Sequence, residues 1–131
     1  MTRTASGATR RKTLPQLSIR IDLDSEGRIG PGKIRLLEQI DALGSISAAG
    51  RAMNMSYKRA WDLVEEVTSI CGAVVQRHTG GRDGGGATLT PLGQSLVARY
   101  RRIEKAAAAA VRADLAGLQS DVGRQRRIKR A

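Results

Sequence analysis

The feature that most constrains this chain is a pair of short helical patterns with almost nothing between them, in the stretch SISAAGRAMNMSYKRAWDLVEEV. The inward positions of the first pattern are Ala49, Gly50 and Met53, and the two small residues allow a neighbouring helix to cross closely. Ser47 is the predicted N-terminal cap of this helix. Asn54 follows it and tolerates the left-handed backbone of a tight turn. We therefore expect two helices that cross at close range.

The second pattern begins after Ser56, which can cap a helix through its hydroxyl group. Its apolar residues recur on one face at helical spacing: Ala60, Leu63, Val64, Val67 and Ile70. Two short helices joined by a tight turn form a helix-turn-helix unit. In such a unit the N-terminal end of the second helix enters the major groove of DNA.

The outward positions at the start of this second helix carry groups that can contact DNA. Lys58 and Arg59 can donate to guanine or to phosphate, and Asp62 can accept from cytosine. Tyr57 can pack on a sugar or a thymine methyl group. The alternative interpretation is that these residues form only a solvated polar face. We predict DNA contacts by Ser56, Tyr57, Lys58, Arg59 and Asp62, together with Arg82 further along the chain.

A hairpin and a helix are predicted before this unit. The alternation of apolar and polar residues from Leu17 to Leu23 indicates a half-buried strand, and residues 28–29 can close a hairpin with it. Pro31 suits the first turn of a helix, whose apolar face continues to Gly44. This helix is expected to be the first of the core.

A second hairpin is predicted after the unit. Residues 74–79 and 87–90 have the character of strands and flank the glycine-rich stretch GGRDGGG. A tip that carries Arg82 beside a helix-turn-helix unit is typical of a DNA-binding wing, and a plain mobile loop is the alternative. A phosphate cradle of the nucleotide-binding kind is excluded, because no Lys-Ser or Lys-Thr pair follows the last glycine. Thr90 and Pro91 then form a good helix start.

The last predicted helix runs from Leu92 to Leu118 and is longer than one small core needs. Its alanine run, Ala106 to Ala110, permits close approach of a second helix. We expect this helix to hold two chains together rather than to pack only within its own chain. The predicted dimerisation residues are Leu96, Tyr100, Ile103, Ala107 and Val111. A twofold homodimer matches a palindromic DNA site.

Composition favours a mainly α fold with small β hairpins, namely a winged helix-turn-helix with a long C-terminal dimerisation helix. Aromatic residues make up 2% of the 131 residues and phenylalanine is absent. The core must therefore consist of Leu, Ile, Val and Ala, which suits helices better than a sandwich. The length allows one domain. We place it at residues 15–118, between tails at residues 1–14 and 119–131 that are expected to be disordered.

The net charge of +11 is concentrated near the two ends of the chain. Residues 1–14 hold four basic and no acidic residues, and residues 117–131 hold five basic residues and one acidic residue, so these ends carry +8. Basic tails raise the affinity for any polyanion, including DNA, RNA and anionic membranes. Charge alone therefore does not identify the partner.

Several classes of function are disfavoured by the sequence. His78, the only histidine, lies in a predicted strand, and Cys71 is expected to be a buried structural thiol. Neither residue has a candidate catalytic partner nearby in the sequence. We expect no enzyme activity, no metal site and no cofactor. No N-terminal segment has the pattern of a secretion signal and no apolar stretch is long enough to cross a bilayer, which predicts a cytoplasmic protein.

The stretches GSISAAGRAMNMSYKRAWDLVEEV and RHTGGRDGGGATLTPLGQSLVARY together resemble the N-terminal DNA-binding domain of the molybdenum-dependent (ModE-type) transcriptional regulators. The order of elements is more distantly similar to that of LysR-type regulators. The likeness covers roughly residues 17–116, and SYKRAW and TGGRDGGGATLTPLG are its most specific parts. It implies a winged domain that dimerises and binds operators of molybdate-uptake and molybdoenzyme genes, with Ser56 to Arg59 on the recognition helix and Arg82 on the wing.

Full-length members of that family carry a C-terminal molybdate-binding portion made of small β-barrel modules, whereas this sequence ends at Ala131. We therefore expect a sequence-specific transcriptional regulator that binds double-stranded DNA, is linked to molybdate genes, and has neither its own molybdate-binding domain nor a small-molecule ligand. The alternative is a basic protein that binds RNA or coats the nucleoid without sequence preference. The sequence favours it less, because Tyr57, Trp61 and Tyr100 are the only aromatic residues available for stacking.

Overall fold

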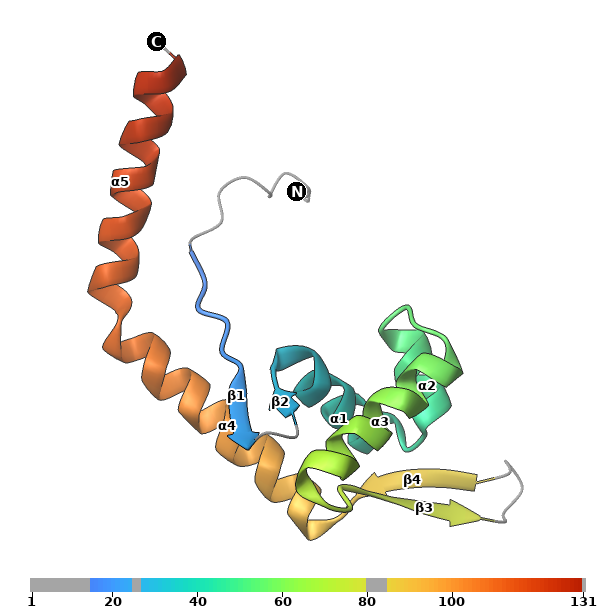
Figure 1. Cartoon of the computed structure of the whole chain (residues 1–131). Coiled ribbons are helices and arrows are strands. Elements are labelled where there is room, and N and C mark those ends of the chain that lie inside the picture. Colours follow the sequence, from blue (N-terminus) through green and yellow to red (C-terminus); the bar gives the residue numbers. More distant parts are fainter. Residues whose placement is uncertain (1–14, 25–26, 80–84, 131) are drawn as a thin grey trace, which may run out of the picture. The chain divides into compact units, whose positions relative to one another are not determined.

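The computed structural model of the chain describes residues 15–24, 27–79 and 85–130 (Figure 1). The elements, in chain order, are β1 (Ile21–Asp24), β2 (Gly27–Ile29), α1 (Pro31–Leu43), α2 (Ile46–Ala52), α3 (Tyr57–Cys71), β3 (Val75–Thr79), β4 (Gly85–Leu89), α4 (Pro91–Ala110) and α5 (Arg112–Arg130). The predicted mainly α fold with small β hairpins is confirmed. Ser18–Glu104 form one compact unit, and the described parts of Met1–Leu17 and Lys105–Ala131 form another.

Each pair of strands forms a separate antiparallel hairpin. In β1–β2, Ile21 lies opposite Ile29, and in β3–β4, Val75 lies opposite Leu89. The first strand begins later than the sequence predicted, because no strand in the described part of the chain pairs with the residues before Ile21. The backbone carbonyl of Ile19 instead accepts a hydrogen bond of 2.7 Å from the hydroxyl group of Tyr100.

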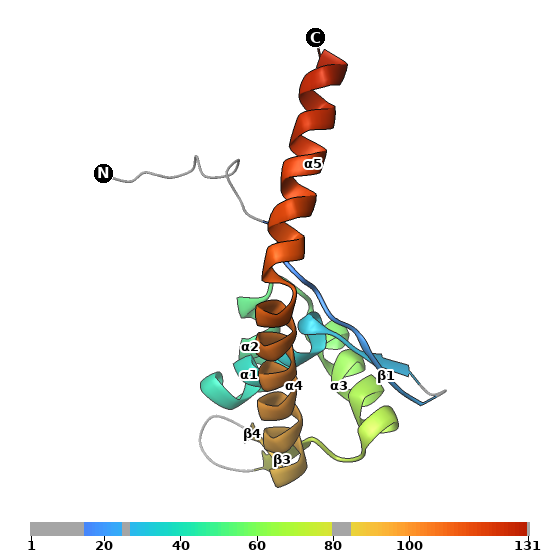
Figure 2. The ribbon, with the colours of Figure 1, turned by 90° about the vertical axis from the view of Figure 1, so that its left-hand side faces the viewer.

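The core of the Ser18–Glu104 unit lies between α1, α2 and α3, and the two hairpins and α4 add to it (Figure 2). α1 presents an almost continuous apolar face to this core and ends at Gly44, whose left-handed backbone closes the helix as expected. The buried residues are Ile29, Ile34, Leu36, Leu37, Ile40, Ile46, Ala49, Ala60, Leu63, Val64, Val67, Val74, Ala87, Leu89 and Tyr100. Aliphatic side chains thus make nearly the whole core.

The structure corrects one predicted helix cap and confirms another. Ser45, not Ser47, caps α2, because Ser45 is the extended residue just before the helix and its hydroxyl accepts from the backbone N–H of Ala48 at 3.0 Å. Ser47 already lies inside the helix. Ser56 caps α3 as predicted, with its hydroxyl accepting from the backbone N–H of Arg59 at 3.0 Å.

Polar contacts fix the first half of α4 to the rest of its unit. Arg101 donates from two nitrogens to the carboxylate of Glu38 on α1, at 2.8 and 3.0 Å, and from a third to Glu104 at 2.7 Å. This bidentate hydrogen bond is the main reason that the pKa of Glu38 lies below its ordinary value. Burial raises the pKa of Tyr100, whose side chain is 1% exposed.

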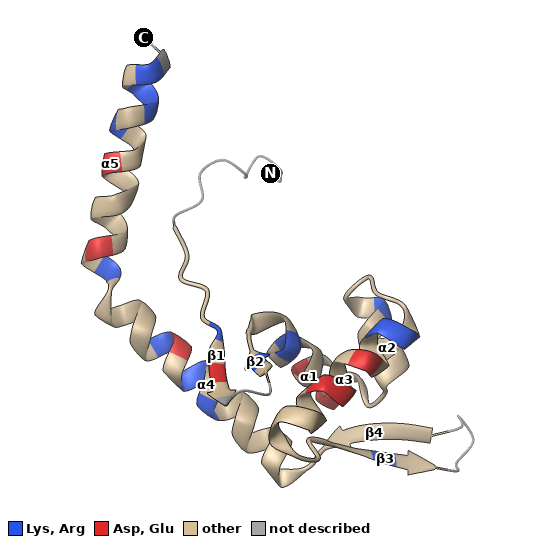
Figure 3. Ribbon diagram, in the orientation of Figure 1, with Lys and Arg blue, Asp and Glu red and all other residues tan. Residues whose placement is uncertain are grey.

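The C-terminal segment differs from the prediction. In place of one helix from Leu92 to Leu118, α4 ends at Ala110 and α5 begins at Arg112. α5 also continues through residues for which a disordered tail was expected. Asp114 lies in its first turn and its C-terminal half is mainly basic (Figure 3), and both features complement the helix dipole. The predicted tail at residues 1–14 lies outside the described residues.

No helix in the described part of the chain is both long and apolar enough to span a membrane.

We predict that Gly93→Ala strongly destabilises the protein. Gly93 is buried in α4, and a Cβ atom placed on it would lie 2.2 Å from the carbonyl oxygen of Val74. Relief of that clash needs a shift of the backbone, so the free energy of unfolding should fall by about 3 kcal/mol in urea denaturation. The control is Gly32→Ala, where no atom lies within 4 Å of the new Cβ. Equal stability of the two variants would contradict the packing described.

We also predict that Glu38→Gln reduces the loss of stability in acid. Because the folded-state pKa of Glu38 is lowered, its contact with Arg101 stabilises the protein above the unfolded-state pKa and is lost as the pH falls through the folded-state value. Urea denaturation at about pH 7 and about pH 3 measures this. The wild type should lose more free energy of unfolding between the two conditions than the variant does, and an equal loss contradicts the assignment.

Candidate functional site

The N-terminal end of α3 presents an exposed polar surface. Tyr57 is 49% exposed, and Lys58 and Arg59 are also exposed. Lys58 forms an ion pair with Asp62 one turn later, at 3.1 Å between Nζ and Oδ2. Ser56 sits at the start of the helix, where its hydroxyl is already used as the cap. Five of the six predicted DNA-contact residues therefore lie together at one helix end.

Arg82, the sixth predicted residue, lies outside the described residues. The hairpin that would carry it is present as β3 and β4, which are paired from Val75 and Leu89 to Thr79 and Gly85. The predicted strand bounds therefore agree closely with the structure, while the position of Arg82 stays a prediction.

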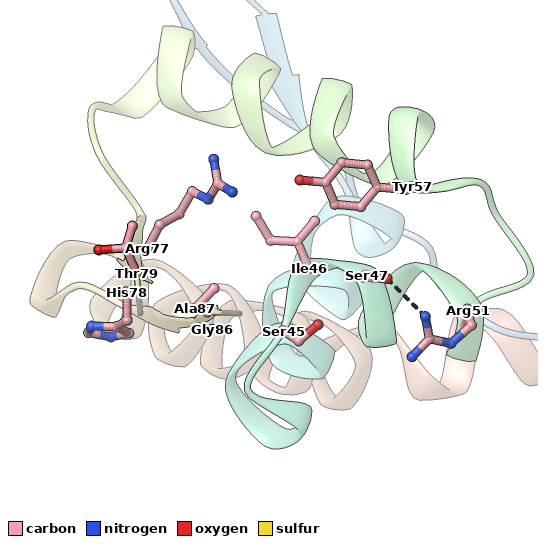
Figure 4. A pocket seen from close by; sticks show the side chains of 11 residues that line it. Ser45, Ile46, Ser47, Arg51, Tyr57, Arg77, His78, Thr79, Gly86 and Ala87 are labelled. Atoms are coloured by element: carbon pink, nitrogen blue, oxygen red, sulfur yellow. Dashed lines mark hydrogen bonds between the residues drawn. The ribbon is translucent and has the colours of Figure 1, made fainter. Parts of the chain in front are cut away.

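A hollow of about 370 Å³ lies between the N-terminal ends of α2 and α3 and the β3–β4 hairpin (Figure 4). We call it the polar hollow. Arg77 from β3 and Tyr57 from α3 reach from two sides toward the space over Ile46 (Figure 4). Its polar side chains are those of Ser45, Ser47, Arg51, Tyr57, Arg77, His78 and Thr79. None of the described residues that line it is a carboxylate. Hydroxyl and guanidinium donors of this kind suit an oxyanion such as a phosphate.

Two arginines of the polar hollow are held by contacts within the chain. The guanidinium carbon of Arg77 lies 4.8 Å from the ring centroid of Trp61, which fits a cation–π contact. Arg51 donates to the hydroxyl of Ser47 at 2.8 Å. Both guanidinium groups are thereby positioned at the edge of the hollow before any anion binds, which lowers the entropic cost of binding.

His78 also lines the polar hollow. Its Nε2 atom lies 2.9 Å from the hydroxyl oxygen of Thr88 on the paired strand, and the histidine side chain is exposed. A lone exposed histidine of this kind can contact an anion. In the part of the chain that the structure describes, no three His, Cys, Asp or Glu side chains gather as a metal site would require.

Arg51 and Arg77 were not among the site residues predicted from the sequence. Arg77 stands in the middle of a predicted strand, two residues after Val75, so the face of the hairpin that it shares could have been derived from the two-residue period of strands. Arg51 stands four residues after Ser47 on one helix, a spacing at which side chains meet. Neither signal reveals that the two arginines line one hollow, since that depends on the packing of β4 against α1, which sets the hairpin beside α2.

The predicted dimerisation residues fall into three environments. Tyr100 is buried within its own unit and donates to Ile19. Ile103, 47% exposed, and Leu96 line a small apolar groove of about 170 Å³ between α4 and the β1–β2 hairpin, together with Ile21, Leu23, Ile29, Arg99 and Tyr100. Ala107 and Val111 belong to the other unit and are partly exposed.

We predict that Ser56→Ala destabilises the protein by about 1 kcal/mol, because the backbone N–H of Arg59 loses its cap. The control is Ser69→Ala on the same helix, at an exposed position whose side chain caps nothing. Urea denaturation of both variants measures the difference. Equal stability would show that the cap contributes nothing.

No protein-family model matches the chain. It is 47% identical over 78 residues to the molybdenum-pterin-binding protein MopB of Rhodobacter capsulatus, and 40% identical over 85 residues to the molybdenum transport protein ModE of Azotobacter vinelandii. It is 44% identical over 71 residues to the DNA-binding transcriptional dual regulator ModE of Escherichia coli K12. These matches cover 59%, 64% and 53% of the chain, but only 29%, 32% and 27% of the relatives.

The chain thus resembles the ModE proteins, as its sequence indicated, and also the Mop proteins, and it spans about a third of the length of these curated relatives. The names of these three relatives describe binding, transport and regulation, and none of them is the name of an enzyme.

The comparisons overturn the predicted function. We expected a sequence-specific DNA-binding transcriptional regulator, linked to molybdate-related genes but without its own molybdate-binding domain, with a nonspecific nucleoid- or RNA-binding protein as the alternative. The link to molybdenum agrees with the names of the relatives. The prediction is otherwise wrong, because MopB and a second relative from Rhodobacter capsulatus, MopA, are named for molybdenum-pterin binding, and the Azotobacter relative for molybdenum transport. The predicted separation from molybdenum binding, and with it the expected lack of a small-molecule ligand, does not agree with these names.

Proposed function

We propose that this chain acts in a molybdenum-linked process and contacts an anionic partner, duplex DNA, through the polar hollow. The observation that carries the proposal is the convergence of two arginines and several hydroxyl groups on one hollow, which no carboxylate among the described residues lines. The names of the relatives support a link to molybdenum, and the name of the Escherichia coli relative includes DNA binding. The hollow is the surface that fits such a partner by charge.

The arrangement of elements around the hollow supports the finer part of this proposal. α2 and α3 are joined by a short turn in which Asn54 has a φ of 57°, the left-handed conformation predicted for a helix-turn-helix. The β3–β4 hairpin beside α3 then corresponds to a wing. We propose that α3 lies in the major groove and that the hairpin, with Arg82 beyond its described residues, lies along the backbone.

The exposed residues of α3 have distinct proposed roles. Arg59 has no ion pair within the described residues and can donate to a base edge or to phosphate. Lys58 must first separate from Asp62, since their charges now neutralise each other. Tyr57 can contact a sugar or a thymine methyl group. The hydroxyl of Ser56 already accepts a hydrogen bond from the backbone N–H of Arg59. It can contact DNA only through its own proton or its second lone pair.

Duplex DNA fits the site better than single-stranded RNA. Proteins that bind single strands stack bases on exposed aromatic rings. Near the polar hollow only Tyr57 is an exposed aromatic residue in the described part of the chain, because Arg77 covers the face of Trp61. Contacts to a phosphate backbone need guanidinium and hydroxyl donors instead, which the hollow supplies.

The test is the salt dependence of DNA binding by Arg51→Gln and Arg77→Gln, with Arg102→Gln as the matched control on the exposed side of α4. Each variant in the hollow should weaken binding of a duplex and lower the slope of log affinity against log salt by about 1, as one phosphate contact is lost. The control should bind as the wild type does. Fluorescence anisotropy measures both quantities, and unchanged slopes would refute the assignment.

We also propose that two chains associate through the apolar groove of α4 and the β1–β2 hairpin. Leu23 and Ile103 are each about half exposed at this groove, and large apolar side chains gathered in one place are typical of an interface. The occupant that we propose is the same groove of a second copy, since a twofold pair presents two α3 helices to one palindromic duplex.

Ile103→Asp should convert the pair into monomers, because it places two like charges at an apolar contact. The control is Ala98→Asp, an exposed position on another face of α4. Sedimentation at micromolar concentration measures the outcome. A wild type that sediments as a monomer would end the proposal of a pair, without affecting the DNA contact proposed for the single chain.

A further inference from the structure

A second hollow with a strongly basic lining lies on the other side of α3 from the β3–β4 hairpin. It is bounded by the β1–β2 hairpin, the start of α1 and the turn between α2 and α3, and its volume is about 770 Å³. We call it the basic groove. Four cationic side chains line it, namely Arg20, Arg28, Lys33 and Arg59, and none of the described lining residues is acidic. Its walls also include apolar side chains, namely Met53, Met55 and Leu63.

Two of these four cations are already partly neutralised within the chain. Arg28 lies 3.4 Å from the carboxylate of Asp22, and Lys33 lies 3.3 Å from the carboxylate of Glu66. Arg20 and Arg59 have no such ion pair among the described residues. The groove therefore contains two guanidinium groups without a compensating charge, and guanidinium groups match the geometry of oxyanions.

The start of α1 adds to the positive character of the groove. No acidic residue lies in the first turn of this helix, and Gly30, the residue at its N-cap, has no side chain that could cap it. The stem of Arg20 packs on Gly30, since a Cβ atom there would lie 3.1 Å from Cγ of Arg20. The glycine thus allows the Arg20 side chain to lie across the helix start, where the backbone N–H groups of the residues after Pro31 are also directed.

We propose that the basic groove binds a small molecule that carries an oxyanion group on an apolar body, and that this ligand competes with DNA for Arg59. The oxyanion is held by Arg20 and Arg59, and the apolar body contacts Met53, Met55 and Leu63. The proposal rests on the DNA contact proposed above, because Arg59 belongs both to this groove and to the exposed end of α3. Binding of either partner must then weaken binding of the other by the same factor.

The apolar walls distinguish this ligand from a flanking DNA phosphate. A volume of 770 Å³ with a mixed lining is typical of a small-molecule pocket, in which apolar side chains surround a few convergent polar groups. A phosphate backbone has no apolar part to place against two methionines and a leucine. The groove therefore fits an amphiphilic anion better than it fits a polyanion.

Calorimetry with phenyl phosphate as the probe tests the groove directly, with ionic strength held constant. The wild type should show saturable binding, and inorganic phosphate and molybdate should bind more weakly because they lack an apolar body. Arg20→Gln should weaken phenyl phosphate binding at least about tenfold, since one of two guanidinium groups is lost. The matched control Arg102→Gln should bind as the wild type does. The proposal would be overturned if the wild type bound molybdate more tightly than phenyl phosphate, or if the wild type and both variants bound phenyl phosphate equally weakly.

Competition with a labelled duplex separates this inference from the DNA proposal. Phenyl phosphate should release the duplex from the wild type but not from Arg20→Gln, whose own affinity for the duplex should change less than about twofold. If Arg20→Gln loses duplex and phenyl phosphate alike, the groove is part of the DNA path and the inference is wrong. If no duplex binds, the DNA proposal and the competition fail, whereas the calorimetric result still decides whether the groove binds a ligand.

Discussion

The close crossing of α2 and α3 is the contact on which the candidate site depends. A Cβ atom on Gly50 would lie 3.2 Å from the Cβ atom of Ala60 and 3.4 Å from the carbonyl oxygen of Met55, so these helices meet almost backbone to backbone. The carbonyl of Gly50 also accepts from the N–H groups of Met53 and Met55, which closes the turn. The direction of α3, and with it every exposed residue at its start, follows from this one contact.

Local chemistry in the sequence was enough to predict the elements and several of their ends. Ser56 was expected to cap a helix, and Asn54 and Gly44 were expected where the backbone turns sharply. In the structure Ser56 caps α3, and Asn54 and Gly44 both have the left-handed backbone conformation. The Ser45 cap was missed because two serines stand near the helix start and either could serve. The full length of α5 was not predicted because apolar residues at helical spacing become rare in its C-terminal half. The acidic residue in its first turn and the basic residues in its C-terminal half nevertheless favour a helix, since both complement the helix dipole.

The candidate site was predictable only in part, since it depends on contacts between elements far apart in sequence. The start of α3 could be identified because its polar residues are contiguous. The polar hollow needs Arg77 of a hairpin and Arg51 of another helix, and no local pattern shows that these converge. Function was the least predictable part: the motif suggested one partner, while the names of the relatives point to molybdenum compounds as well.

The stacking of Arg77 on Trp61 couples the polar hollow to the tryptophan fluorescence of the protein. Trp61 is the only tryptophan of the chain, and the cation that covers its ring is one of the groups that line the polar hollow. An anion that draws the guanidinium away uncovers the indole and exposes it to water, so occupancy of the hollow is coupled to the intrinsic fluorescence of a single chromophore. Binding at this site can therefore be followed by the fluorescence of Trp61, without a label.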